Sequence, residues 1–317
     1  MNVLVVGGAG FIGSHLCDDL IKKGYKVYCM DNLSLGTRAN IAHLENQGAF
    51  ELIKGDASDR EEIEAVFAMA EPEYVFHLAA NSDIQASASS PDVEYRNTYT
   101  TTYEILMAMR RHGVKRIFFA STSAVYGEKK DVLLSENTPN LSPISYYGAA
   151  KLGSEALISA FTYMNDMTAL VFRFPNVIGP RLTHGVIYDF IRKLKLDSSK
   201  LEILGDGKQT KPYIYVKDLV AAIASLSNID SNVEETGVRL YNVGVEGATS
   251  VTAIADILCE EMGLCNVKYE YTGGEGGWKG DVPRFTYSTE KIRAEGWKPE
   301  YNSDDAVRLT VKSIIGV

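Results

Sequence analysis

The feature that most constrains this chain is a glycine-rich turn near its first residue. Residues 3–13 read VLVVGGAGFIG, so an apolar run leads directly into closely spaced glycines and then into a helical pattern. Gly8, Gly10 and Gly13 fit G-x-G-x-x-G, and Gly7 extends the set backwards. Because glycine has no side chain, a pyrophosphate can approach such a backbone, and the helix that follows offers free N–H groups and the positive end of its dipole. The pattern predicts a dinucleotide site that contacts Gly7, Gly10, Phe11, Ile12 and Gly13.

Glycine-rich turns also close hairpins without binding anything, so the flanking pattern has to decide between the two interpretations. Apolar residues recur one helical turn apart after the glycines, Gly24 ends this helix, and Lys26–Met30 reads as a second strand. Asp31 follows directly, where an acidic residue hydrogen-bonds the adenosine ribose and repels a 2′-phosphate. The sequence therefore favours NAD over NADP.

The overall charge restricts the partners. The chain has 317 residues and a net charge of -9, which argues against nucleic acid or an anionic membrane surface as a partner. No apolar run approaches the ~18 residues of a membrane span, and the first strand leaves no room for a secretory leader, so we expect a cytoplasmic protein. The four cysteines form no C-x-x-C pair and lie near no histidine cluster, which predicts reduced thiols and no metal site.

The order of predicted elements indicates an α/β fold. Strands and helices alternate, which is typical of a Rossmann-like, doubly wound parallel sheet with helices on both faces. After Gly179 the alternation weakens, and proline, glycine and basic residues become frequent. We therefore expect an NAD-binding domain of residues 1–176 plus about 213–245, and a smaller C-terminal α/β substrate-binding domain of about 177–212 plus 246–317.

Further cofactor contacts are predicted where strands end, because the carboxyl edge of such a sheet faces the ligand. Asp56 and Ala57 are candidates to contact adenine, although Asp56 also suits a plain turn. Leu78, Ala79 and Ala80 are small enough, as a group, to let a cofactor lie against the backbone. His77 ends the same strand, and a lone histidine there is more often structural than catalytic.

The candidate chemistry lies in Tyr147 and Lys151, which are four residues apart and share one face of a helix. An ammonium group beside a phenol stabilises the phenolate and lowers its pKa, as a positive nicotinamide would, so Tyr147 is the predicted base. The lysine can also bind the cofactor ribose. Thr122, at the exit of a preceding strand, is a candidate hydrogen-bond partner for a substrate hydroxyl. Tyr146 is the alternative base, but only Tyr147 has a lysine four residues on.

These motifs resemble those of the extended short-chain dehydrogenase/reductases, and within them the nucleotide-sugar epimerases of the UDP-glucose 4-epimerase type. The resemblance runs nearly from end to end and includes GGAGFIGSHL, HLAA from His77, STSAVYG from Ser121, YGAAK from Tyr147, FRFPNVIGPR from Phe172, GDGKQTKPYIYVKD from Gly205 and GWKGDVP from Gly277.

The resemblance implies tightly held NAD, with Asn32 and Asn97 among its contacts, and a homodimer built on the helices that contain Asn97 and Tyr147. It gives Thr122 the Ser/Thr role, Tyr147 the role of base and Lys151 that of its partner. It implies that a sugar is oxidised at C4 by NAD, that the 4-keto sugar turns within the site, and that hydride returns to its other face. Its substrate contacts correspond here to Thr122, Ser123, Tyr147, Asn176, Val186 with its neighbour Ile187, Lys211, Tyr213, Asp281 and Arg284.

Related activities differ at the residue after Thr122. Sugar-nucleotide 4,6-dehydratases and UDP-glucuronate decarboxylases carry an acid there, whereas this chain has Ser123 and Ala124, which favours 4-epimerisation. UDP-glucose/UDP-galactose is the expected substrate pair. The alternatives are 4-epimerisation of UDP-glucuronate or UDP-GlcNAc, a 4-dehydrogenase or reductase, and a non-catalytic NAD-sensing protein.

Two departures from the family pattern concern the diphosphate. Lys211-Pro212 stands where relatives have arginine, and Trp278 stands where some epimerases have another. A lysine lacks the bidentate fork of a guanidinium, and Arg181, Lys279 and Arg284 are the candidates to compensate. Phe285 falls near a position that gates the 2-substituent of the sugar in relatives, and a bulky ring there favours glucose and galactose over N-acetylated sugars.

Overall fold

The computed structural model describes residues 1–81, 90–129, 132–227, 229, 236–274, 280, 282 and 284–316. The chain divides into two compact units. The first unit comprises residues 1–125, 141–173 and 220–241, and the second comprises residues 126–140, 174–219 and 242–317. The sequence-based division drew the boundary differently, because it assigned residues 126–140, 174–176, 213–219 and 242–245 to the NAD-binding domain.

The first unit is built on a seven-stranded sheet with the order β12-β7-β5-β4-β1-β2-β3. The strands are β1 (Asn2–Val6), β2 (Lys26–Asp31), β3 (Phe50–Lys54), β4 (Tyr74–His77), β5 (Arg116–Thr122), β7 (Thr168–Phe174) and β12 (Gly237–Asn242). The strands from β3 across to β5 pair in parallel, and the prediction of an α/β fold is confirmed. Because the chain moves from β1 to β2 and β3 on one side and then to β4 on the other, the strand order reverses beside β1. Ligands bind at such a switch point in open α/β sheets.

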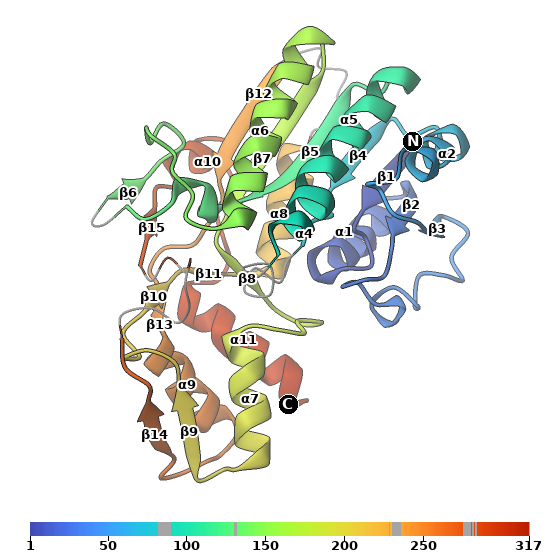
Figure 1. Cartoon of the computed structure of the whole chain (residues 1–317). Helices are drawn as coiled ribbons and strands as arrows, with labels where there is room; N and C mark the ends of the chain where they lie inside the picture. Colours follow the sequence, from blue (N-terminus) through green and yellow to red (C-terminus); the bar gives the residue numbers. More distant parts are fainter. Residues whose placement is uncertain are drawn as a thin grey trace. The chain divides into compact units, whose positions relative to one another are not determined.

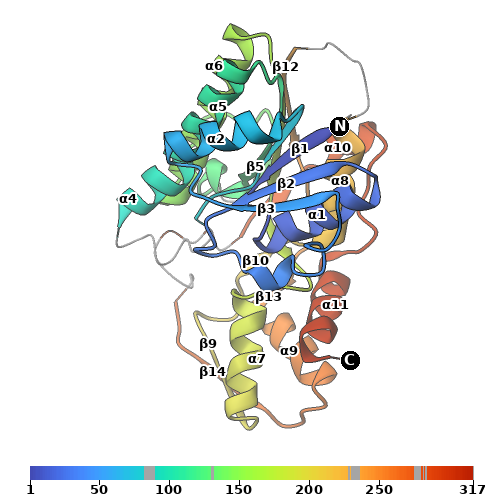
Figure 2. The same ribbon diagram turned by 90° about the vertical axis from the view of Figure 1, so that its right-hand side faces the viewer.

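Helices cover both faces of this sheet (Figure 2). The helices α2 (Arg60–Ala70), α5 (Thr101–His112) and α6 (Tyr146–Met164) lie on one face, with α1 (Phe11–Lys22) and α8 (Val216–Leu226) on the other. Asp59 caps α2 by accepting from the N–H groups of Glu61 and Glu62, and Ser145 caps α6 by accepting from that of Gly148. These caps explain where both helices begin.

One predicted helix is interrupted. Residues 91–111 have the sequence pattern of one continuous helix, but the structure has α4 (Pro91–Glu94), a π-helical segment η2 (Tyr95–Thr100) and then α5. A π-helical turn inserts an extra residue into the helical repeat without changing residue types, so spacing alone did not reveal it. The segment η2 carries Asn97.

The second unit has its own hydrophobic core, formed by α7 (Val186–Leu196), α9 (Val251–Glu261), α11 (Ser303–Ile315) and the parallel pair β9 (Lys200–Ile203) and β14 (Lys268–Tyr271). These elements are labelled in Figure 1. Its shorter elements are η3 (Ser123–Tyr126), which begins in the first unit, β6 (Leu133–Leu134), β8 (Asn176–Ile178), β10 (Thr210–Lys211), β11 (Tyr213–Tyr215), β13 (Thr249–Ser250), β15 (Thr286–Tyr287) and α10 (Glu290–Ala294). A 3₁₀ turn, η1 (Arg38–Asn40), lies in the first unit.

Across the described ranges, none of the helices combines the length and apolar character that a membrane span requires.

Candidate active site

The glycine turn joins β1 to α1 by close backbone packing. Gly7 has φ of 84°, and a Cβ atom there would lie 2.7 Å from the backbone nitrogen of Ala79. A Cβ at Gly13 would lie 2.2 Å from the carbonyl oxygen of Gly7. These positions therefore require glycine, which explains the sequence pattern independently of any ligand.

The start of α1 is the predicted anion site. Gly10 occupies the N-cap position, and no side chain among the described residues caps it. A Cβ at Gly10 would meet only the carbonyl oxygen of Gly7, at 3.2 Å. The helix therefore begins, at Phe11 and Ile12, with backbone N–H groups that no cap residue occupies, which suits a pyrophosphate.

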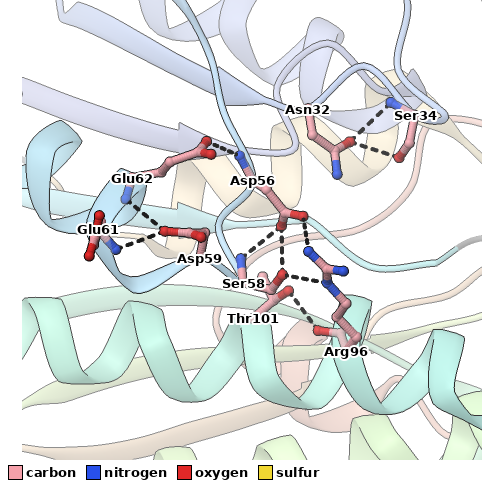
Figure 3. Close-up of polar contacts among 9 residues, drawn as sticks. All are labelled: Asn32, Ser34, Asp56, Ser58, Asp59, Glu61, Glu62, Arg96 and Thr101. Atoms are coloured by element: carbon pink, nitrogen blue, oxygen red, sulfur yellow. Dashed lines mark hydrogen bonds and ion pairs between the residues drawn. The ribbon is translucent and has the colours of Figure 1, made fainter.

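Asp31 is fixed at the edge of this turn. Its carboxylate accepts hydrogen bonds from the backbone N–H groups of Ala9 (3.0 Å) and Leu33 (2.8 Å). Burial raises the pKa of Asp31, and these backbone bonds oppose the rise. The adjacent Asn32 is exposed and accepts from both the N–H and the hydroxyl of Ser34 (Figure 3). Asp31 therefore holds a position suited to ribose hydroxyls.

Asp56 joins the loop after β3 to the π-helical segment (Figure 3). Its carboxylate accepts from the N–H and hydroxyl of Ser58, at 2.9 and 2.7 Å, and from Arg96 Nη2 at 3.1 Å. Arg96 Nε also donates to the hydroxyl of Ser58 (3.2 Å). The Ser58 bonds are those of a plain turn, but the bond to Arg96 brings η2 to the loop in which Ala57 is buried. Sequence reasoning missed Arg96 because it lies forty residues further along the chain.

The segment after β4 packs beside the glycine turn. The N–H groups of Leu78 and Ala79 both donate to the carbonyl of Val6 at 2.9 Å, and residues 78–80 stay partly accessible. His77, by contrast, is fully buried, and its Nε2 lies 2.9 Å from the hydroxyl of Thr102. Burial lowers the pKa of His77 well below its usual value, and the charge of Lys151 adds to this, so His77 is a neutral structural group.

The structure brings Thr122, Tyr147 and Lys151 together in the first unit. The Thr122 hydroxyl, at the end of β5, hydrogen-bonds the phenol of Tyr147 in the first turn of α6. Lys151 is 1% exposed and donates from Nζ to the carbonyl of Ala120 (2.6 Å). Its Nζ lies 5.9 Å from the centre of the Tyr147 ring. Tyr146 is 50% exposed, so the geometry favours Tyr147 as the base.

The direction of the pKa shift of Tyr147 differs from the sequence-based expectation, which was that Lys151 lowers this pKa. Burial raises the pKa of Tyr147 above its usual value, the negative charge of Glu94 raises it further, and the hydrogen bond from Thr122 opposes the rise. Burial also lowers the pKa of Lys151 to about 7, against the charges of Glu94 and Glu155. The expectation was wrong for the chain alone because desolvation is the largest effect on both groups, and Lys151 is not among the groups that shift the pKa of Tyr147.

A buried ion pair lies behind Lys151. Glu155, one turn further along α6, accepts from Arg173 Nε (3.0 Å) and Nη2 (2.6 Å). The hydroxyl of Ser121, next to Thr122, also donates to Glu155. Sequence analysis missed this network, although the one-turn spacing of Tyr147, Lys151 and Glu155 was a signal that could have revealed it.

Apart from Thr122, Ser123 and Tyr147, the predicted substrate residues that the structure describes lie in the second unit. Asn176 in β8 is exposed, and Val186 is the partly buried first residue of α7. Tyr213 is 5% exposed and belongs to the hydrophobic core, which favours a packing role over substrate contact. A β-bridge pairs the backbone of Arg284 with that of Thr210, the residue before Lys211. Asp281, Trp278 and Lys279 lie outside the described residues.

Ser123, the remaining predicted substrate contact, follows Thr122 in η3 and is partly buried. Ile187, beside Val186, is buried in the core of the second unit. Arg181, proposed to compensate for the missing arginines, is partly accessible, and its φ is 70°.

The sequence profile of the NAD dependent epimerase/dehydratase family matches residues 3–244. The chain belongs to this family. The predicted resemblance is thereby confirmed, and the cofactor is NAD. The predicted cradle fits it, because backbone packing at Gly7 and Gly13 excludes side chains and the start of α1 lacks a cap residue.

Similar proteins carry several epimerase names. A putative UDP-glucose 4-epimerase of Methanocaldococcus jannaschii is 32% identical over 98% of this chain and 97% of its own length. A probable UDP-arabinose 4-epimerase 3 of Oryza sativa subsp. japonica is 33% identical over 95% of this chain and 78% of its own. The crystal structure of Thermus thermophilus UDP-glucose 4-epimerase with NAD aligns with this chain over the full length of both chains. The TM-score is 0.88 and the sequence identity is 29%.

Proposed function

We propose that this protein is an NAD-dependent 4-epimerase of a nucleotide sugar, and that UDP-glucose and UDP-galactose are its substrates. One observation carries the proposal: Thr122 hydrogen-bonds Tyr147, and Lys151 lies on the same face of α6 one turn away. Family membership and relatives named as UDP-sugar 4-epimerases support it.

In the proposed reaction, the Tyr147 phenolate takes the proton of the sugar 4-hydroxyl, and Thr122 donates a hydrogen bond to the same oxygen. NAD, when bound, supplies the hydride acceptor at C4 and later the hydride donor. Tyr147 then returns its proton to the oxygen of the inverted carbon. Lys151 holds positive charge beside the phenolate while it forms. The cycle consumes no oxidant and leaves NAD unchanged.

Epimerisation is favoured over dehydration by the residues after Thr122. Ser123 and Ala124 provide no carboxyl group for eliminating water. Glu94 is the buried carboxylate whose charge acts on Tyr147, and its two oxygens accept hydrogen bonds from Asn81 and Thr98. It is therefore oriented toward these two residues.

The choice of sugar rests on Phe285, because relatives of similar identity carry different sugar names. Phe285 packs edge-to-face on Tyr287, with ring centres 5.4 Å apart, within the second unit. A ring fixed in this way would restrict a bulky 2-substituent, which favours glucose and galactose over N-acetylated sugars.

The test is to incubate the purified protein with UDP-, dTDP- and GDP-sugars without added cofactor and to follow C4 epimers by NMR. We expect interconversion of UDP-glucose and UDP-galactose without net NADH. Steady NADH production would instead identify a dehydrogenase, and NAD binding with no turnover would identify a sensor. Y147F is expected to abolish turnover while NAD stays bound, and Y146F, at the exposed neighbour, is the matched control.

We also infer a homodimer formed through the helices that carry Asn97 and Tyr147. Exposed aromatic side chains on this part of the chain support it, since Tyr95 in η2 and Tyr163 in α6 are 65% and 86% exposed. Sedimentation analysis of the purified protein tests it. A cytoplasmic location is proposed on the four free cysteines, of which Cys17, Cys29 and Cys259 are buried.

A further inference from the structure

Glu94 is a buried carboxylate that the proposed reaction does not use. It is the last residue of α4, it is 1% exposed, and α4 packs against α6, the helix that carries Tyr147 and Lys151. An ionisable group is rarely buried to this degree unless partners compensate it. Its position therefore needs a physical explanation.

Two neutral donors hold this carboxylate. Asn81 Nδ2 donates to Glu94 Oε1 (2.8 Å), and the Thr98 hydroxyl donates to Oε2 (2.9 Å). The network continues from the carbonyl of Thr98 to the hydroxyl of Thr102 (2.8 Å) and on to His77. These bonds orient Glu94 and connect it to η2. All of these donors are neutral, so the bonds bring no positive charge to the carboxylate.

The buried positive group on which Glu94 acts is Lys151. The charge of Glu94 acts on both Lys151 and Tyr147, and in each case favours the protonated form. Glu155 acts on Lys151 from its own helix and is itself paired with Arg173, while His77 is neutral. Among the described residues, Glu94 is therefore a carboxylate with no guanidinium partner whose charge acts on both Tyr147 and Lys151.

We infer that Glu94 is a positioning residue whose buried carboxylate fixes the number of protons that Tyr147 and Lys151 carry together. Without it, both groups would lose their protons at lower pH. The inference rests on the proposed function for its kinetic test, so a second test that needs no substrate accompanies it.

The kinetic test compares E94Q with wild type over a range of pH. The active form of the pair has lost one of its two protons, so activity rises as the first proton leaves the pair and falls as the second leaves. We expect both limbs of the E94Q profile to move to lower pH by about 1 unit. E94D keeps the charge and is expected to keep both limbs in place. E104Q is the matched control, because Glu104 is also buried in this unit but pairs with Arg60.

A merely structural role of Glu94 would lower the height of the profile without moving it, and that result would overturn the inference. If E94Q does not fold, the triple variant E94M/N81L/T98V replaces the network with apolar groups and is expected to show the same displacement.

The second test follows the titration of the Lys151 side chain by isotope-edited NMR of the NAD-bound protein, with K151M used to assign the signal. The midpoint is expected to fall by about 1 pH unit in E94Q and to stay unchanged in E104Q. Equal midpoints in all three proteins would refute the role of Glu94. If wild type epimerises no sugar, the proposed function fails, but this titration still decides the inference.

Discussion

At the scale of single residues, the catalytic candidates show how burial changes the chemistry that a motif suggests. Spacing along the chain correctly placed Tyr147 and Lys151 on one helix face. It gave no information about solvent, and solvent exclusion brings the pKa of Lys151 down to about 7. A buried amine of this kind lowers the free energy of unfolding, because the folded protein does not solvate its charge.

We therefore expect K151M to abolish turnover and yet stabilise the protein at neutral pH, by on the order of 2 kcal/mol. The unfolded lysine titrates near 10.5 and the folded one near 7, so the unfolded state binds more protons between these values. Wild-type stability then rises with pH across this window. The advantage of K151M is fully present below about pH 7 and shrinks as the pH rises towards 10.5.

Urea unfolding of both proteins at several pH values measures this difference. K195M, at an exposed position in α7, is the control and is expected to match wild type throughout. A stability difference between K151M and wild type that does not change with pH would contradict the assignment of a buried, titrating Lys151.

At the scale of elements, close backbone packing positions the catalytic side chains. A Cβ atom at Gly148, in the first turn of α6, would lie 2.7 Å from the carbonyl oxygen of Ala124 and 3.0 Å from Cβ of Pro143. G148A should move this turn away from the loop that follows Thr122 and separate Thr122 from Tyr147.

We expect G148A to lower kcat by roughly 10-fold to 100-fold, because small displacements of reacting groups are costly, and to destabilise the fold by about 1–3 kcal/mol. Steady-state kinetics and thermal unfolding measure the two effects. G48A is the control, since a Cβ at Gly48 meets nothing within 4 Å. Unchanged kcat in G148A would show that this contact does not position Tyr147.

The ion pair between η2 and the loop after β3 leads to a prediction about cofactor retention. Arg96 connects Asn97's segment to Ser58 and to Asp56, and Asp56 is a predicted adenine contact. Because the pair is partly exposed, R96A is expected to weaken NAD binding by only about two- to fivefold. Calorimetric titration of the cofactor-stripped protein measures this. R60A removes a similar arginine–carboxylate link, to Glu104, and is expected to leave the affinity for NAD unchanged.

The elements also show what could be predicted from the sequence. The glycine turn, Asp31 and the Tyr147–Lys151 pair depend on local spacing, so their places in the fold could be derived. The network of Glu94, Asn81 and Thr98 depends on the π-helical turn, which a regular helical pattern does not reveal. The pairing of Arg173 with Glu155 and of β9 with β14 joins distant segments, and a single sequence does not specify such contacts.

At the scale of the whole molecule, the division into two units predicts that the two ligands order different parts of the chain. The predicted NAD contacts lie in the first unit, at the carboxyl edge of its sheet. Asn176, Val186, Lys211 and Arg284 lie in the second. A ligand stabilises the segments that bind it, and hydrogen exchange reports that stabilisation locally.

We expect NAD to slow amide exchange in residues 7–13, 31–36, 56–58 and 95–98 of the cofactor-stripped protein, with little effect on β9, β14 and α9. Adding UDP-glucose to the NAD-bound protein should then slow exchange near residues 176–178, 186–187 and 210–211. Hydrogen exchange with mass spectrometry resolves these segments. UMP, which lacks the sugar and one phosphate, is the control and should protect fewer of the second set. If NAD alone protected both sets fully, the substrate residues would be ordered by the cofactor, and the separate binding roles proposed for the two units would be wrong.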